Sequence, residues 1–190
     1  PEYIKTEGIT KVTLEDVRLA GIAGKVIRLL GRCKLSDDGK VYAYVGPHLV
    51  DKSSPIASVE DVFNAIMVHG DMVGNVMFYG PGAGKFPTAS AVCADVIDAV
   101  KHIESRKYLG WNDAGAEVVA DMSGFTSRYY VRIDGENARS AATQVFSGVE
   151  FIDDELAIAF ITSELSQSEF EAKLASLSER VDILSQMRVL

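Results

Sequence analysis

The stretch 78–100, FYGPGAGKFPTASAVCADVIDAV, joins an apolar segment to a glycine-rich turn and then to a sequence with helical periodicity. Pro87 falls in the first turn of the predicted helix, where its missing N–H costs nothing. The apolar residues that follow the turn recur at helical spacing, at Ala89, Val92, Val96, Val100 and Ile103. The stretch therefore predicts a strand, a tight turn over residues 80–84 and an amphipathic helix.

The turn itself, Gly80-Pro-Gly-Ala-Gly84, is a candidate anion site. Backbone N–H groups at a strand-to-helix turn can face a phosphate, and Lys85 could add positive charge. The pattern is neither a P-loop nor a G-x-G-x-x-G fingerprint. A tight turn without a ligand is about equally well supported, because glycine is common in turns. The residues alone leave both interpretations open.

Upstream of this stretch, the pattern predicts two helices and four strands. One helix begins after Thr13, with Asp16 at the capping-box position, and stops within residues 21–24. Pro47 is expected to end a strand, and Ser58 to begin a short helix. The strands are predicted at 26–30, 41–45, 65–69 and 75–79.

Downstream, the rhythm changes to that of a small α+β module. Strands are predicted at 128–133, 148–152, 156–162 and 183–190, with an acidic turn at 153–155 and helices at 137–146 and 166–181. The order is β-α-β-β-α-β, which is a ferredoxin-like arrangement. The predicted fold class is therefore α+β, although such a fold implies no function by itself.

Charge is unevenly distributed along the 190 residues, whose net charge is −8. Residues 1–110 hold 13 Lys/Arg and 13 Asp/Glu, whereas residues 111–190 hold 6 and 14. The acidic excess argues against nucleic acid as a partner. The break in composition predicts a first domain at 1–110, a linker at 111–126 and a second domain at 127–190.

Other features predict a cytoplasmic protein with a sizeable core. Apolar residues make up 47% of the chain, yet no run reaches the roughly 18 residues of a membrane span, so no membrane partner is expected. The start, PEYIKTEGIT, lacks the pattern of a secretory signal. Cys33 and Cys93 lie among apolar residues and are predicted to be buried free thiols.

No catalytic residue can be assigned from these patterns. The three histidines, His48, His69 and His102, are scattered and lack metal-ligand spacing, so no metal site is predicted. Three serines have no evident base partner: Ser53, Ser54 and Ser90. Three carboxylates are candidate acid–base groups but are more typical of caps or solvated side chains: Glu7, Asp16 and Asp71.

Several segments together resemble homoserine dehydrogenase. They are Glu7-Gly-Ile, 26–31 (VIRLLG), 45–50 (VGPHLV), 64–71 (NAIMVHGD), 78–84 (FYGPGAG) and 87–92 (PTASAV), in the order and at the spacing of that family. The resemblance covers roughly residues 5–105. It implies an NAD(P)-dependent oxidoreductase that interconverts L-homoserine and L-aspartate 4-semialdehyde in threonine, methionine and isoleucine biosynthesis.

The resemblance implies that the glycine turn contacts the cofactor, NAD or NADP. Gly84 matches the cofactor-binding glycine of the family, and Gly82 and Ala83 are its neighbours in the turn. The family's Rossmann domain and catalytic lysine do not match any part of this chain, and Lys5 and Lys11 are not at the position of that lysine. We therefore expect a fragment without catalytic residues, inactive alone and without bound cofactor.

By the same resemblance, residues 1–110 form part of a substrate and dimerisation domain, with a mixed sheet and helices on one face. Residues 127–190 resemble an ACT-type regulatory domain, which implies an amino-acid effector such as threonine. The loop Asp134-Gly-Glu-Asn137 lacks the usual proline of that site, so a module for dimerisation without a ligand is the rival reading. A homo-oligomer, a dimer above all, is expected. The alternative function is a stand-alone amino-acid-sensing or dimerisation protein without the chemistry.

Overall fold

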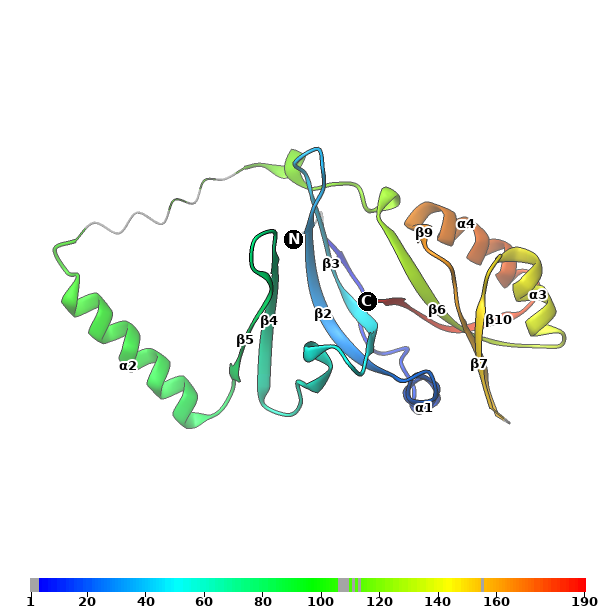
Figure 1. Ribbon diagram of the computed structural model, residues 1–190, viewed down its shortest axis with the longest axis horizontal. Coiled ribbons are helices and arrows are strands. Elements are labelled where there is room, and N and C mark those ends of the chain that lie inside the picture. The colour runs from blue at the N-terminus through cyan, green and yellow to red at the C-terminus, as the bar shows by residue number, and fades with distance from the viewer. Residues whose placement is uncertain (1–3, 106–109, 111, 113, 155) are drawn as a thin grey trace. The chain divides into compact units, whose positions relative to one another are not determined.

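The computed structural model describes residues 4–105, 110, 112, 114–154 and 156–190 (Figure 1). They group into two compact units, unit 1 from residues 1–52 and 114–190 and unit 2 from residues 53–113. The elements of unit 1 are β1 (Lys5–Thr6), α1 (Leu14–Ile22), β2 (Lys25–Leu35), β3 (Val41–Asp51), β6 (Thr126–Asp134), α3 (Ala138–Val145), β7 (Glu150–Asp153), β8 (Ile158–Ile161), β9 (Leu165–Ser166), α4 (Gln167–Ser178) and β10 (Asp182–Val189).

A mixed eight-stranded sheet forms the centre of unit 1. Its main order is β1-β3-β10-β6-β8-β7, with β2 also paired to β3 and β9 to β6. β10 is parallel to β3, with Arg188 opposite His48, whereas β2 and β3 are antiparallel. This pairing places residues 1–52 and the C-terminal module in one unit, which differs from the boundaries 1–110, 111–126 and 127–190 expected from charge.

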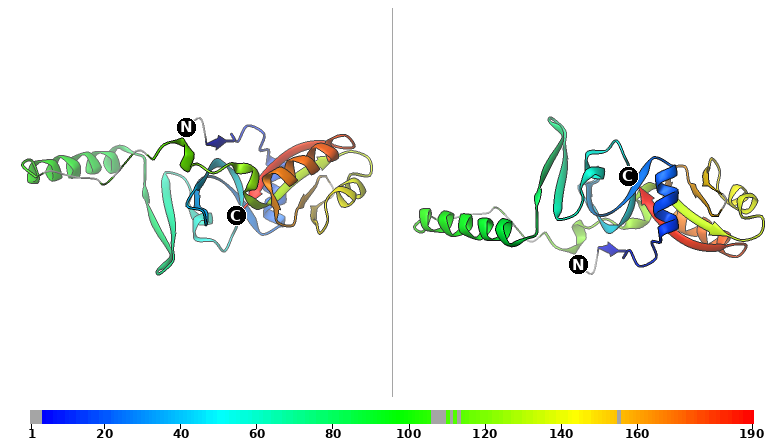
Figure 2. Two further views of the ribbon diagram at one scale, coloured as in Figure 1. Left: turned by 90° about the horizontal axis from the view of Figure 1, so that it is seen from above. Right: turned by 90° about the horizontal axis from the view of Figure 1, so that it is seen from below.

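Helices cover both faces of the C-terminal part of this sheet. The side chains of β6 alternate between the two faces, so β6 packs against helices on each of them. Tyr129, Val131 and Ile133 pack in a core with residues of α3 and α4. Tyr130, on the other face, packs with Leu19 and other residues of α1. The two views of Figure 2 look from opposite sides, and α4 lies in front of the sheet in one and α1 in the other. The result is an α+β arrangement of three layers, in which the predicted order β-α-β-β-α-β is present as β6, α3, β7, β8, α4 and β10, with the two-residue strand β9 added before α4.

Pro47 does not end the second strand, as the sequence predicted, because β3 continues to Asp51. The carbonyl of Val45 accepts from the N–H of Glu7, and the carbonyl of Leu49 from the N–H of Leu190. The backbone nitrogen and carbonyl of Pro47 must therefore point to the same edge of β3, away from β2. On that edge β1 pairs only up to Val45 and β10 only from His48 onward. The missing N–H of proline consequently costs no bond to β2.

Unit 2 contains the 3₁₀ helix η1 (Pro55–Ser58), the hairpin β4 (Phe63–Gly70) with β5 (Gly74–Pro81), and the helix α2 (Lys85–Lys101). The hairpin and α2 agree with the sequence prediction. The helix predicted to begin at Ser58 was wrong, since Ser58 ends η1 and its hydroxyl donates to the carbonyl of Pro55. Asp61 has φ 54°, a left-handed conformation that prevents helical continuation there.

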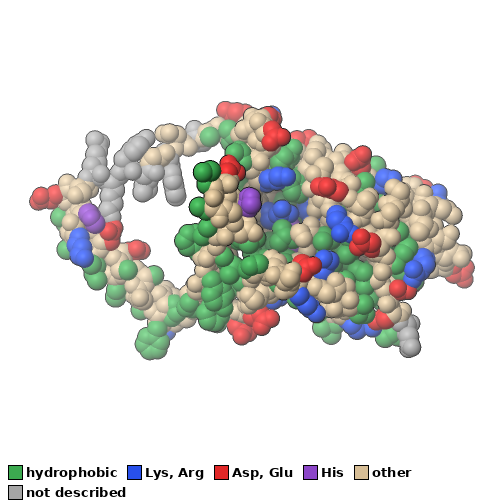
Figure 3. All heavy atoms as spheres, in the orientation of Figure 1, with side chains coloured by type: hydrophobic (Ala, Val, Ile, Leu, Met, Phe, Trp, Pro, Cys, Tyr) green, Lys and Arg blue, Asp and Glu red, His purple; other side chains and the backbone are tan. Residues whose placement is uncertain are grey.

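Both cysteines are exposed, so the prediction of buried thiols was wrong. Cys33 lies on β2, whose described partner is β3 alone, and Cys93 lies on α2, where no residue is buried. Apolar neighbours in sequence indicate burial only where another layer covers them. Figure 3 shows hydrophobic side chains gathered at the surface of the hairpin and α2. They include Ile66, Met72, Phe78, Phe86 and Ile103, which are between 64% and 97% exposed.

The described part of the predicted linker is structured. It contains η2 (Ala116–Val118) and η3 (Met122–Gly124). Val119 forms a parallel bridge with Val41, and the N–H of Ala120 donates to the Val41 carbonyl at 2.9 Å. Of the predicted acidic turn at 153–155, Glu155 lies outside the described residues.

Candidate functional site

The predicted glycine turn connects the end of β5 to the start of α2. Gly84 is the N-cap residue of α2, and its carbonyl accepts the N–H of Thr88 at 3.1 Å. Its φ of 116° lies where side chains are rarely tolerated. A Cβ at this position would meet only Pro87, at 3.5 Å. Glycine is therefore required at position 84 by the backbone conformation rather than by crowding within the described chain.

Gly82 has a different reason to be glycine. A Cβ there would lie 1.7 Å from the Nδ2 atom of Asn64, on the neighbouring strand. Its N–H donates to the carbonyl of Val62 at 3.1 Å, which anchors the turn to the hairpin. At Gly80, by contrast, a Cβ would meet nothing within 4 Å. Gly82 therefore has a backbone contact of its own, and a side chain at this position would require Asn64 to move.

The start of α2 has the features of an anion site. No side chain caps it, and its first turn carries no acidic residue. The N–H groups of Gly84, Lys85 and Phe86 have no partner among the described residues, and all three residues, with Ala83, are exposed. Free N–H groups and the helix dipole favour negative charge at a helix start. A phosphate of a dinucleotide fits this chemistry.

The three histidines are not brought together. His69 forms a 2.8 Å hydrogen bond with Asn75 across the hairpin, and His102 lies 3.0 Å from Asp98 on α2. His48 is buried in unit 1, and its Nδ1 lies 2.9 Å from the Gly46 carbonyl. Within the described ranges, no group of three His, Cys, Asp or Glu residues could hold a metal ion.

Sequence reasoning missed a buried polar cluster around Asp16, which we call the Asp16 cluster: Thr13, Asp16, Tyr130, Arg132 and Ser185. The Asp16 carboxylate accepts from Arg132 Nε at 2.8 Å, from the Tyr130 hydroxyl at 3.0 Å, from the Thr13 N–H at 2.8 Å, and from the Ser185 hydroxyl. The cluster joins the start of α1 to β6 and β10. The one sequence signal was Arg132, a charged residue on the strand face that also holds Tyr130.

The charge of Asp16 is stabilised despite its burial. Burial alone would raise the pKa of this carboxyl group. The hydrogen bonds from Ser185, Thr13, Arg132 and Tyr130 outweigh that effect, and the pKa lies below its ordinary value. Asp16 is therefore an ionised carboxylate whose two oxygens both accept hydrogen bonds within unit 1.

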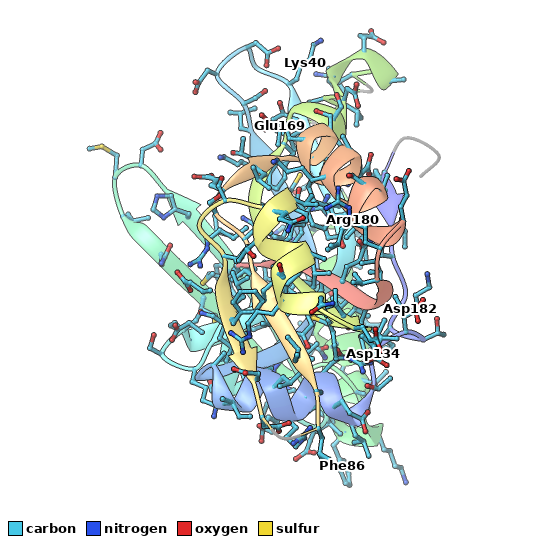
Figure 4. All side chains as sticks on the ribbon, turned by 90° about the vertical axis from the view of Figure 1, so that its right-hand side faces the viewer. Lys40, Phe86, Asp134, Glu169, Arg180 and Asp182 are labelled. Carbon is cyan, nitrogen blue, oxygen red and sulfur yellow. The ribbon has the colours of Figure 1, made fainter. Side chains whose placement is uncertain are left out.

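The loop Asp134–Asn137, which we call the helix-entry loop, borders a pocket of about 270 Å³ in unit 1. Arg132, Glu15, Asp134 and Asp154 supply its charged lining, and Gly135 and Ala138 form the edge toward α3. The N–H of Gly135 donates to its neighbour Asp134 at 2.8 Å. Figure 4 shows Asp134 beside Asp182, its partner across β6 and β10.

The described helices include none that is long and apolar enough to cross a membrane.

Comparisons with known proteins point to one family. The sequence model of homoserine dehydrogenase matches residues 1–97. The homoserine dehydrogenase of Bacillus subtilis (strain 168) is 32% identical over 196 residues, which cover 94% of this chain and 45% of that protein. That of Mycobacterium tuberculosis (strain H37Rv) is 35% identical over 201 residues, covering 96% of this chain and 45% of that protein.

Solved structures agree with the sequence matches. The crystal structure of a homoserine dehydrogenase from Thiobacillus denitrificans superposes with a TM-score of 0.78 at 27% identity, covering 100% of this chain and 48% of that one. The crystal structure of S. aureus homoserine dehydrogenase at pH 7.0 superposes with a TM-score of 0.72 at 29% identity, covering 100% of this chain and 48% of that one. The chain thus spans about half the length of these relatives. The residues that match the family model include the glycine turn and the start of α2. The chain belongs to the homoserine dehydrogenase family.

Proposed function

We propose that this chain is part of an NAD(P)-dependent homoserine dehydrogenase that interconverts L-homoserine and L-aspartate 4-semialdehyde. The observation that carries the proposal is the family match over residues 1–97, which contains a glycine turn with free N–H groups at the start of α2. When it is bound, the nicotinamide cofactor accepts the hydride of homoserine or donates a hydride to the aldehyde. The contribution of this chain is one edge of the nucleotide site.

In that site, Gly84, Ala83 and Gly82 form the contact with the cofactor. The left-handed backbone at Gly84 turns the N–H groups of the first turn of α2 outward, where they would face a phosphate. Lys85 adds a positive charge beside them. Gly82 holds the turn against Val62 and Asn64, so the donors keep a fixed direction. We assign no catalytic group to this chain.

A chimera tests the proposal. This chain would replace the matched 45% of the B. subtilis relative, and homoserine-dependent reduction of NAD⁺ or NADP⁺ would be followed at 340 nm. We expect activity in the chimera and a raised KM for the cofactor in its Gly84→Ala variant, with Gly80→Ala as the matched control because a Cβ is free of contacts there. A folded chimera without activity would contradict the proposal, and equal KM values in both variants would remove the turn from the nucleotide site.

The chain alone should lack the activity. We expect no NAD(P)H-dependent reduction of aspartate 4-semialdehyde by the isolated chain, because the part of the family that matches no segment here carries the nucleotide domain and the catalytic lysine. The same 340 nm assay on the isolated chain checks this. Reduction at a rate comparable to the chimera would show that the chain holds a complete site.

The C-terminal module is proposed to be an ACT-type regulatory domain. The order of β6, α3, β7, β8, α4 and β10 supports this assignment, as does the charged pocket at the helix-entry loop. Glu15, Asp134 or Asp154 there could receive the ammonium group of an amino acid. Calorimetric titration with L-threonine tests the effector role, and a flat trace at millimolar ligand would leave the module without it.

We also propose that the chain assembles as a homodimer through unit 2. The hairpin and α2 expose apolar side chains on both elements, and β4 and β5 pair only with each other among the described strands. Exposed apolar patches with open strand edges are typical of interfaces between chains. Light scattering after size exclusion should give twice the 20.6 kDa of the chain. A monomer at micromolar concentration would contradict the dimer.

A further inference from the structure

A second, larger crevice lies in unit 1, apart from the helix-entry loop. It has a volume of about 720 Å³. Its lining comes from residues 5–12, from the exposed side of α4 over residues 171–178, from residues 183–186 at the start of β10, and from Pro47. Apart from Leu184, none of its lining residues borders the pocket at the helix-entry loop.

The crevice lies where β1 has stopped pairing with one edge of β3 and β10 has not yet joined it. β1 is parallel to β3 at Tyr44 and Val45, and β10 is parallel to β3 at His48 and Leu49. Pro47 lies between these two pairings and lines the crevice. The carboxyl end of β1 opens directly into this crevice.

Its charged groups include both signs. Lys5 Nζ lies 2.9 Å from Glu171 Oε1 and 3.7 Å from Glu7 Oε1. Glu7 Oε2 accepts the Tyr44 hydroxyl at 2.8 Å. In the described chain, Glu171 Oε2 and Lys11 Nζ have no hydrogen-bond partner, and Glu7 Oε1 has only the distant Lys5. One carboxylate oxygen and one ammonium group are therefore unpaired, and a second carboxylate oxygen has only the 3.7 Å contact with Lys5.

Part of the crevice lining is apolar. It comes from Leu174 and Ala175 of α4, Ile183 of β10 and Val12 before α1. An apolar lining beside charged groups of both signs matches a molecule that has an aliphatic part and a dipolar head.

We propose that this crevice binds a small zwitterion with an aliphatic side chain, of the α-amino acid type. Its ammonium group contacts the carboxylates of Glu7 and Glu171, and its carboxylate contacts Lys11. The aliphatic part lies on the wall formed by Leu174 and Ile183. The proposal concerns a site other than the helix-entry loop and does not depend on the dehydrogenase function.

Calorimetric titration of the chain tests the assignment with three matched probes. They are L-leucine, 3-methylbutylamine, which lacks its carboxylate, and 4-methylpentanoate, which lacks its ammonium group. We expect L-leucine to bind, and each of the other two to bind at least about tenfold more weakly because one charged contact is lost. No heat from L-leucine at millimolar concentration would overturn the proposal, and equal binding of the amine would overturn the zwitterion.

Variants locate the binding. Lys11→Ala and Glu171→Gln should each weaken L-leucine binding about tenfold, and Ala175→Trp, on the exposed face of α4, should abolish it by filling the crevice. Lys40→Ala, in the turn between β2 and β3, is the charge-matched control, and Asp134→Ala tests the helix-entry loop (Figure 4). Both should bind L-leucine like the parent chain. Loss of binding in Asp134→Ala with retention in Lys11→Ala would move the ligand to the helix-entry loop and overturn the proposal.

Discussion

Replacing Asp16 by asparagine tests whether the Asp16 cluster holds α1 against the C-terminal module. The carboxylate is buried and accepts hydrogen bonds from four residues, and Arg132 beside it is only 9% exposed in its side chain. Asparagine keeps one acceptor oxygen and turns an NH₂ group toward donors. It also leaves the guanidinium of Arg132 buried without its counter-charge.

The expected loss of stability follows from those contacts. Removing one partner of a buried ion pair costs about 3–5 kcal/mol. Arg132 keeps one hydrogen bond, from Nη2 to the Thr13 hydroxyl at 3.1 Å, so we expect the lower end, about 3 kcal/mol. For a chain of this size that corresponds to a fall in Tm of roughly 6–12 °C.

Urea unfolding followed by circular dichroism measures this loss. The matched control is Asp153→Asn, because Asp153 pairs with Arg139 at the surface, where the side chains are 43% and 49% exposed. That pair should contribute less than about 1 kcal/mol. A loss below about 1 kcal/mol for Asp16→Asn, or equal losses in the two variants, would refute the reasoning.

A double variant separates the charge from the packing. Asp16→Leu with Arg132→Met removes both charges and retains apolar volume, and it should destabilise the chain less than Asp16→Leu alone, since no buried charge is left unpaired. Additive losses would show that the two side chains act independently.

Three further outcomes are expected. Burial lowers the pKa of His48 to about 4, below an unfolded value near 6.5. Unit 1 should therefore lose about 3 kcal/mol of stability as the pH falls from 6.5 through 4, because the unfolded chain binds this proton more readily. His48→Gln should remove this pH dependence from the urea midpoints. Gly82→Ala should destabilise unit 2 by at most about 1 kcal/mol, because the exposed Asn64 side chain can rotate away from the new Cβ, and adding Asn64→Ala should remove that loss in the same unfolding assay. Ser166→Ala should lower stability by about 1 kcal/mol, since the Ser166 hydroxyl caps α4, and an unchanged midpoint would contradict the cap.

Local patterns were enough to predict the order of the elements and the glycine turn. Strand patterns and turn residues identified β4, β5 and β6, a capping residue identified the start of α1, and helical periodicity identified α4. These signals act over a few residues, so they remain legible without knowledge of the tertiary structure. The family resemblance rested on the same kind of local segment.

The pairings between distant segments could not be predicted in this way. Asp16 meets Tyr130, Arg132 and Ser185, which are 114, 116 and 169 residues away, and nothing in its own surroundings in the sequence distinguishes it from an ordinary cap. The addition of β10 to the edge of β3 is equally remote, and it changed both the grouping of the units and the fate of Pro47. The exposure of Cys93 depends on which layer covers α2, and periodicity carries no such information.

The position of Pro47 has a consequence for how the protein is made. β3 emerges from the ribosome well before β10, so one edge of this long, largely apolar strand remains unpaired by β10 during synthesis. An exposed edge of this kind can pair with a neighbouring nascent chain and aggregate. Proline in the middle of that edge offers no N–H to an intruding strand and interrupts its ladder. Pro47 can therefore act as a gatekeeper that protects the edge until the correct strand has been synthesised.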